Sequence, residues 1–175
     1  MLSAQLLQDY GHLFKPKHGQ VLDLACGKGQ NGLYLKEQGI DVLFADIKQQ
    51  TLDSLVTSDN VLQQDTWCAD FESESQVDAM ILSKMQLQGI IVFRYLHRPL
   101  FNALQQAIQP GGIVIYETFT EANRVFGRPH REQFLLKKDE LKTLFKDWDV
   151  LFYFEGIKHN PNRAIAQIVC QKRQF

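Results

Sequence analysis

The segment VLDLACGKGQNG, residues 21–32, constrains the fold of this chain more than any other part of the sequence. An apolar run ends in a glycine-rich turn, and the helical pattern GLYLKEQ follows at once. Gly27, Gly29 and Gly32 fit the spacing G-x-G-x-x-G, which brings backbone N–H groups and a helix N-terminus close to a bound molecule. We therefore expect a strand, a tight loop and a helix that together form a binding site.

Asp23 narrows the class of ligand, because it lies in the first strand, four residues before the first glycine. A carboxylate at this place would repel a pyrophosphate, whereas it suits a ligand that carries an ammonium group and a sulfonium. S-adenosylmethionine (SAM) is such a ligand. The residues therefore predict a methyltransferase that uses SAM and releases S-adenosylhomocysteine.

The composition is that of an ordinary globular protein. The chain has 175 residues, 45% hydrophobic and 22% charged, which we interpret as one SAM-binding domain over residues 1–175. A net charge of −1 argues against a nucleic-acid partner, since such surfaces are basic. We recognise no secretory signal and no run of about 20 apolar residues, so we expect a cytoplasmic protein without a membrane span. Cys26, Cys68 and Cys170 are too scattered to predict a disulfide framework or a metal site.

Hydrophobic spacing predicts strands and helices in alternation. Strands are expected at 21–25, 40–46, 66–70, 87–94, 113–119, 148–157 and 163–171. Helices are expected at 3–14 with Ser3 as N-cap, 31–38 closed by Gly39, 49–58, 98–109 and 137–145. Residues 74–84 fit a strand or a helical turn, and we favour the helical turn because 87–94 is the better central strand. Residues 121–136 show no regular pattern.

This alternation predicts an α/β protein. We expect a Rossmann-like, doubly wound, mostly parallel seven-stranded sheet, closed by an antiparallel pair at the C-terminal end of the chain. Ligands of such sheets bind beyond the carboxyl ends of the strands.

Several runs between about residues 20 and 145 resemble the class I SAM-dependent methyltransferases. LDLACGKGQNGLYLKEQGIDV is similar to the corresponding run of the tellurite-resistance type of small methyltransferase. RYLHRPLF, PGGIVIYETF and FGRPHREQFLLKKDEL resemble small bacterial methyltransferases of undefined substrate. The resemblance implies the class I methyltransferase fold and SAM as cofactor, and it implies little about the methyl acceptor.

The resemblance also implies a cofactor site. Asp23 would hold the ammonium group of SAM, Asp46 would accept the ribose hydroxyls, and Asp70 would lie near the adenine amino group. Each acid has a structural alternative: Asp23 as a core aspartate that caps the loop, Asp46 as a helix cap, and Asp70 as a surface acid in a strand of uncertain register. The expected set is Asp23, Ala25, Cys26, Gly27, Gly29, Asn31, Asp46, Ile47, Asp70, Phe71 and Arg94.

The acceptor is expected next to the segment that follows the fourth strand. His97 is the first choice for a general base, since histidine titrates near neutrality, although it fits equally a side chain that bonds the backbone. Arg94 and Arg98 would bind an anionic acceptor or a neighbouring carboxylate, and Glu117 would meet one of these arginines. The expected catalytic residues are His97, Arg94 and Tyr95, and the expected acceptor-binding residues are Arg98, Glu117, Arg124, Arg128 and His130.

The first interpretation is therefore a methyltransferase that acts on a small anionic or soft nucleophilic acceptor, as a monomer or homodimer. A nucleic-acid or protein methyltransferase fits less well, because the fourth strand ends in RYLH and not in an N/D-P-P-F/Y run. Asp23 argues against an NAD-dependent oxidoreductase, while a non-catalytic SAM-binding protein stays possible. Since few residues precede the first strand, we expect the 120–136 loop or a second subunit to enclose the acceptor.

Overall fold

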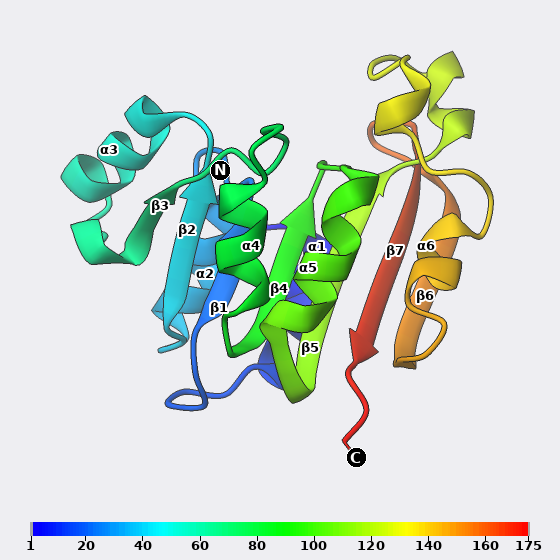
Figure 1. Ribbon diagram of the computed structural model, residues 1–175. Helices are drawn as coiled ribbons and strands as arrows, with labels where there is room; N and C mark the ends of the chain where they lie inside the picture. The colour runs from blue at the N-terminus through cyan, green and yellow to red at the C-terminus, as the bar shows by residue number, and fades with distance from the viewer. Residues whose placement is uncertain (1, 175) are drawn as a thin grey trace.

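The protein is built around one mixed seven-stranded sheet with the strand order β3-β2-β1-β4-β5-β7-β6 (Figure 1). The computed structural model describes residues 2–174. The strands are β1 Val21–Leu24, β2 Val42–Asp46, β3 Thr66–Cys68, β4 Leu87–Phe93, β5 Ile108–Phe119, β6 Asp149–Lys158 and β7 Arg163–Gln171. Strands β1 to β5 pair in parallel, and β7 pairs antiparallel with both β5 and β6. The expected sheet with its antiparallel closing pair is confirmed.

Helices cover both faces of the sheet, and the two layers bury separate cores. The helices are α1 Gln5–Tyr10, α2 Gln30–Glu37, α3 Gln49–Ser58, α4 Val77–Ser83, α5 Phe101–Ala107 and α6 Glu140–Leu144. In Figure 1, α4 and α5 lie in front of the sheet and α1 and α2 behind it. The front core includes Leu82 of α4 and Leu104 of α5, and the rear core includes Leu7 of α1 and Leu35 of α2.

Strand β4 shows why the sheet is buried on both faces. Ile90 and Val92 belong to the front core, while Ile91 belongs to the rear core and Phe93 packs against it. Successive side chains of a strand point to opposite faces, so a nearly continuous apolar run is what a doubly covered central strand requires.

Most differences from the expected elements lie at their ends. Residues 77–83 form helix α4, in agreement with the favoured helical turn. Strand β5 begins at Ile108 and not at 113, because Ile108 pairs with Leu87 of β4, and Gly111 and Gly112 exchange backbone hydrogen bonds with Lys172. Ser3 is not the N-cap of α1: Ala4 occupies that position, without a side-chain bond.

The connections at the carboxyl ends of the parallel strands form the upper edge of the molecule in Figure 1. Residues 120–136, which have two short 3₁₀ turns at Glu121–Val125 and Glu132–Phe134, rise above the end of β5 and the start of β7. Within residues 2–174, no helix has both the length and the apolar character that crossing a membrane requires.

Candidate functional site

The loop after β1 packs tightly on one side and is open on the other. Gly29 adopts a left-handed backbone with φ of 74°, and a Cβ added there would lie 2.7 Å from the Leu55 side chain. Gly27 has φ of 54°, but a Cβ added there would meet nothing within 4 Å. Glycine therefore lets the chain turn at both positions, and at Gly27 it also leaves the backbone accessible to a ligand.

Asp23 is a buried carboxylate at the base of this loop. Its side chain is 3% exposed, and Oδ2 accepts a hydrogen bond of 2.9 Å from the backbone N–H of Gly32. Burial raises the pKa of Asp23 to about 7; the bond from Gly32 opposes this shift, and the charge of Asp46 adds to it. Within residues 2–174 Asp23 forms no salt bridge, so a ligand cation beside it would relieve the cost of its burial.

Asp46 holds the glycine loop from the end of β2. Its Oδ2 accepts from the backbone N–H of Gly27 and its Oδ1 accepts from the backbone N–H of Lys48, both at 2.9 Å. A carboxylate offers about four acceptor positions, so Asp46 retains lone pairs for ligand hydroxyls. The structural alternative for Asp46 was a helix cap, but the N-cap residue of α3 is Lys48, and it makes no side-chain cap bond.

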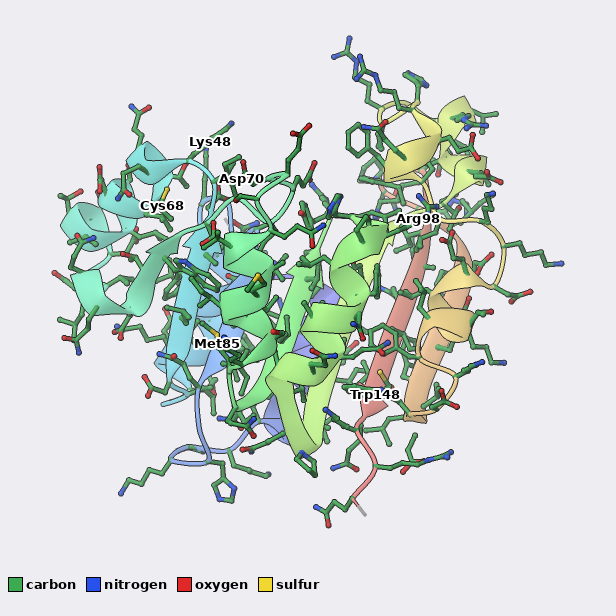
Figure 2. All side chains as sticks on the ribbon, viewed as in Figure 1. Lys48, Cys68, Asp70, Met85, Arg98 and Trp148 are labelled. Atoms are coloured by element: carbon green, nitrogen blue, oxygen red, sulfur yellow. The ribbon has the colours of Figure 1, made fainter. Side chains whose placement is uncertain are left out.

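A cavity of about 420 Å³ lies next to Asp46. It brings together five of the residues expected at the cofactor, namely Ala25, Asp46, Ile47, Asp70 and Phe71, with Ala69, Glu72 and Tyr95. Phe71 is held by an edge-to-face contact with Trp67, with ring centroids 5.2 Å apart. Figure 2 shows Asp70 at the same upper edge of the molecule as Arg98.

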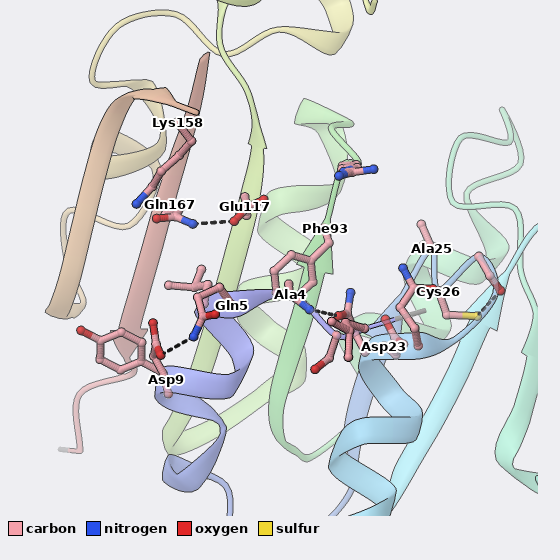
Figure 3. Close-up of a pocket in the computed structure, with 18 of the residues that line it drawn as sticks. Ala4, Gln5, Asp9, Asp23, Ala25, Cys26, Phe93, Glu117, Lys158 and Gln167 are labelled. Carbon is pink, nitrogen blue, oxygen red and sulfur yellow. Dashed lines mark hydrogen bonds between the residues drawn. The ribbon is translucent and has the colours of Figure 1, made fainter. Parts of the chain in front are cut away.

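A larger cavity of about 1070 Å³ begins on the other side of the glycine loop. Asp23, Ala25, Cys26, Gly27 and Asn31 line it, together with Arg94 and Glu117 from the ends of β4 and β5. Figure 3 shows Asp23 and Cys26 on one side of this cavity and Glu117, Gln167 and Lys158 on the other. Burial, with smaller effects of the Asp23 and Asp46 charges, raises the pKa of the Cys26 thiol, which therefore stays protonated.

The N-terminal segment, and not residues 120–136, forms one wall of the larger cavity. Seven residues of this wall lie between Leu2 and Tyr10. The backbone N–H of Ala4 donates to Oδ1 of Asn31 at 2.8 Å, which ties this segment to the first turn of α2 (Figure 3). No residue of the 120–136 segment lines this cavity, whereas α1 reaches it because Leu6 and Leu7 are buried in the rear core.

Glu117 does not meet an arginine through its side chain. It is 8% exposed, lines the larger cavity and accepts a hydrogen bond from Nε2 of Gln167. Its backbone oxygen accepts from the backbone N–H of Arg94 at 2.9 Å. Within the part of the chain described, Glu117 forms no salt bridge, so the expected ion pair is absent there.

Three basic residues that line the larger cavity were not predicted from the sequence. Lys158, His159 and Arg163 lie at the turn between β6 and β7 and line the cavity beside Gln167. The run GIKHNPNR looks like an ordinary connection, and its only signal is the basic residue on each side of the turn. Its position became clear only from the topology, since β7 lies between β5 and β6 and brings this turn to the end of β5.

Of the three expected catalytic residues after β4, Arg94 and Tyr95 line cavities and His97 does not. Arg94 has φ of 60°, is exposed and lines the larger cavity. Tyr95 lines the 420 Å³ cavity, and its backbone oxygen accepts a bond of 2.7 Å from the hydroxyl of Tyr116. His97 lines neither of these cavities, so the structure does not bring it to the other two.

Arg98 binds a neighbouring carboxylate and two backbone oxygens. A neighbouring carboxylate was the alternative to an anionic acceptor that the sequence predicted for it. Its Nε and Nη2 donate to the two carboxylate oxygens of Glu140 at 2.6 and 2.9 Å. Nη1 and Nη2 also donate to the backbone oxygens of Gln133 and Leu135. Burial acts to raise the pKa of Glu140, but the hydrogen bonds and charge of Arg98 outweigh it and lower that pKa. Arg98 therefore anchors the 120–136 segment (Figure 2).

The basic residues of the 120–136 segment lie away from the larger cavity. Arg124, Arg128 and His130 are exposed, and none of them lines it. Nε of Arg124 donates to the backbone oxygen of His130 at 3.2 Å. Arg128 lines a third cavity, between this segment and the ends of β4 and β5.

Comparison with known proteins identifies the family. The family model of the tellurite resistance protein TehB matches residues 12–163. The chain belongs to this family. No curated protein sequence matches the chain.

Solved structures agree with the TehB family in fold. TehB from Haemophilus influenzae superposes with a TM-score of 0.73 at 22% identity, over 95% of this chain and 61% of that one. A SAM-dependent methyltransferase from Methanosarcina mazei gives a TM-score of 0.71 at 11% identity over 100% of both chains. One from Archaeoglobus fulgidus gives 0.67 at 16% identity, over 95% of this chain and 91% of that one. This chain thus spans about three-fifths of the Haemophilus protein, and its fold is that of the class I SAM-dependent methyltransferases.

The predicted family and fold are therefore confirmed, and the site fits SAM as cofactor. Gly27 exposes its backbone where no side chain fills the space, and Asp23 is a buried acid without a cation among the described residues. The two cavities meet at Ala25, which lines both, so one extended ligand can reach from Asp46 to Asp23.

Proposed function

We propose that the protein transfers the methyl group of SAM to a small anionic acceptor held in the larger cavity. The observation that carries this proposal is the buried Asp23 carboxylate beside the open backbone of Gly27. A dinucleotide phosphate would be repelled there, whereas the ammonium and sulfonium of SAM would be attracted. Asp46 would accept the ribose hydroxyls with its remaining lone pairs, and Phe71 would lie beside the adenine.

Three cationic side chains favour an anionic acceptor. Arg94 follows β4, Lys158 ends β6 and Arg163 begins β7; all three line the larger cavity, and none of them forms a salt bridge within residues 2–174. Their positive charge would bind and orient an anion. The family takes its name from tellurite resistance, so tellurite, a small oxyanion, is the first acceptor to test.

Methyl transfer would require the protein mainly to position the acceptor in line with the methyl group of SAM. SAM supplies a methyl group on a sulfonium, and transfer forms the acceptor–carbon bond as the carbon–sulfur bond breaks, with the electron pair left on sulfur. Arg94, Lys158 and Arg163 would hold the acceptor in line, and the N-terminal segment would exclude water. An anion that attacks through a free lone pair has no proton to lose, so no general base is required. His97, which does not line this cavity, then needs no catalytic role.

Binding measurements test the cofactor. S-adenosylhomocysteine at a hundredfold excess over its Kd should stabilise the protein by about 2.7 kcal/mol, and NAD should not stabilise it. Equal stabilisation by NAD, or no effect of any adenosyl ligand, would contradict the proposal. Methyl transfer is then measured with methyl-labelled SAM and tellurite or a small thiolate; binding without transfer to any anion would show a non-catalytic SAM-binding protein.

A pair of arginines at opposite ends of β7 tests the acceptor side. Arg163 lines the larger cavity, whereas Arg173 forms an exposed pair with Asp149 at 2.8 Å, beyond the other end of β7. Arg163→Gln should raise the KM for the acceptor, since it removes a contact present before and during transfer, and leave the Kd of S-adenosylhomocysteine unchanged. Arg173→Gln is the matched control. A KM that changes equally in both variants would show that Arg163 does not bind the acceptor.

A further inference from the structure

A third cavity of about 440 Å³ lies under the 120–136 segment. Most of its wall is apolar: Leu96 and Tyr95 come from the segment after β4, Phe119 from the end of β5, and Pro129 and Phe134 from the 120–136 segment. A cavity of this size accommodates an organic ligand that has an apolar body.

Two arginines line this apolar cavity, and neither is neutralised within the described chain. Arg94 and Arg128 form no salt bridge within residues 2–174, in contrast to Arg98, which binds Glu140. Arg94 also has a left-handed backbone, with φ of 60°. For a residue other than glycine this conformation costs energy, and it often occurs at functional sites.

The third cavity is distinct from the larger one, because Arg94 is the one lining residue that the two share. Glu117 faces the larger cavity, and its neighbour Thr118 faces the third, as the alternation of side chains along β5 requires. Arg94 lines both of these cavities, and Tyr95 lines both the third cavity and the one next to Asp46. A ligand in the third cavity would therefore lie next to both the cofactor and the acceptor.

We propose that the third cavity binds an organic anion, a carboxylate with an apolar body such as a phenyl or branched alkyl group. The apolar wall matches such a body, and the two arginines match its charge. An inorganic oxyanion has no apolar group to pack against the apolar wall. A neutral hydrocarbon has no negative charge to pair with Arg94 and Arg128. This proposal goes beyond the proposed function, because binding here does not depend on methyl transfer.

The test uses 3-phenylpropionate as the probe and calorimetry on the full chain, with and without saturating S-adenosylhomocysteine. We expect 3-phenylpropionate to bind, and the neutral 3-phenylpropan-1-ol and acetate to bind at least tenfold more weakly, because each lacks one of the two matching features. Backbone NMR shifts caused by 3-phenylpropionate should centre on Thr118, Phe119 and Phe134. No binding, or shifts centred elsewhere, would overturn the proposal.

A pair of arginine variants from one segment gives the second measurement. Arg128→Gln should weaken 3-phenylpropionate binding about tenfold, while Arg131→Gln, an exposed residue that does not line the cavity, should not. Equal effects of both variants would mean that only the general positive charge of the segment attracts the probe. A protein that binds 3-phenylpropionate but not S-adenosylhomocysteine would contradict the proposed function and leave this inference standing, so the two can fail separately.

Discussion

The buried Asp23 carries a cost in stability and, in the proposed site, binds the ligand cation, and its pKa predicts how both depend on pH. Its folded pKa of about 7 lies above the ordinary value of 3.8, so the native protein keeps a proton that the unfolded chain has already lost. Stability due to this group is therefore full below about pH 4, falls as pH rises to about 7, and is constant above. Asp23→Asn should remove this slope and raise the free energy of unfolding at pH 8 by roughly 1–3 kcal/mol. Urea unfolding of the wild-type and Asp23→Asn proteins at pH 5 and pH 8 measures this difference in the free energy of unfolding.

The same residue predicts the pH dependence of cofactor binding. SAM should favour the charged form of Asp23, so binding below pH 7 should release a proton and affinity should rise with pH between about 5.5 and 7. Asp23→Asn should bind SAM more weakly and lose this rise. Calorimetry in two buffers of different ionisation enthalpy measures the proton release. An affinity of the wild-type protein that does not change over this range would mean that Asp23 lies away from the ligand cation.

We expect Asp46 both to stabilise the glycine loop and to bind the ligand. Asp46→Ala removes the acceptor for the Gly27 and Lys48 N–H groups as well as the expected ribose contact, so both SAM affinity and stability should fall. Asp46→Asn keeps one acceptor oxygen and should lose less of each. Thermal shifts with and without S-adenosylhomocysteine separate the two effects, and a loss of stability with unchanged affinity would leave Asp46 as a structural residue only.

At the scale of elements, the pair between Arg98 and Glu140 should hold the 120–136 segment against the sheet. Because the folded pKa of Glu140 is lowered, its contribution is present above about pH 4.5 and is lost as pH falls through the folded pKa. Glu140→Gln should lower the free energy of unfolding by about 1–2 kcal/mol at pH 7 and speed amide exchange in residues 133–136. Glu132→Gln, which breaks an exposed contact of 3.6 Å with Lys137, is the control and should change little.

The elements themselves were the part of the structure that the sequence could predict. The apolar run 87–94 and the alternation of strands with helices identify a parallel sheet, because the local spacing of apolar residues reflects burial on one or two faces. The ends were less predictable: β5 begins five residues early because Ile108 pairs with Leu87 of β4, and Gly111 and Gly112 bond to Lys172, which is about 60 residues away in the sequence.

In the whole molecule, the sequence did not predict those parts of the candidate site that form where distant segments meet. The sequence placed the glycine loop and Asp46 together because β1, its loop and helix, and the adjacent strand β2 follow one another along the chain, and Asp46 does contact Gly27. Lys158 and Arg163 were missed because only the insertion of β7 between β5 and β6 brings them to the cavity. His97 was expected to act as a base because it follows the central strand, but its side chain lines neither of the two main cavities.

The N-terminal segment is tied to the first turn of α2, directly after the glycine loop. The bond from Ala4 N–H to Oδ1 of Asn31 fixes this segment over the larger cavity. Asn31→Ala should speed amide exchange in α1, whose first turns bond to the Ala4 oxygen, and should weaken S-adenosylhomocysteine binding. In the wild-type protein, bound S-adenosylhomocysteine should slow exchange at Leu7 and Gln8. Gln8→Ala, which removes bonds only to Ser3 within the segment, is the control. If α1 exchanges at the same rate with and without ligand, the segment does not close over the cofactor.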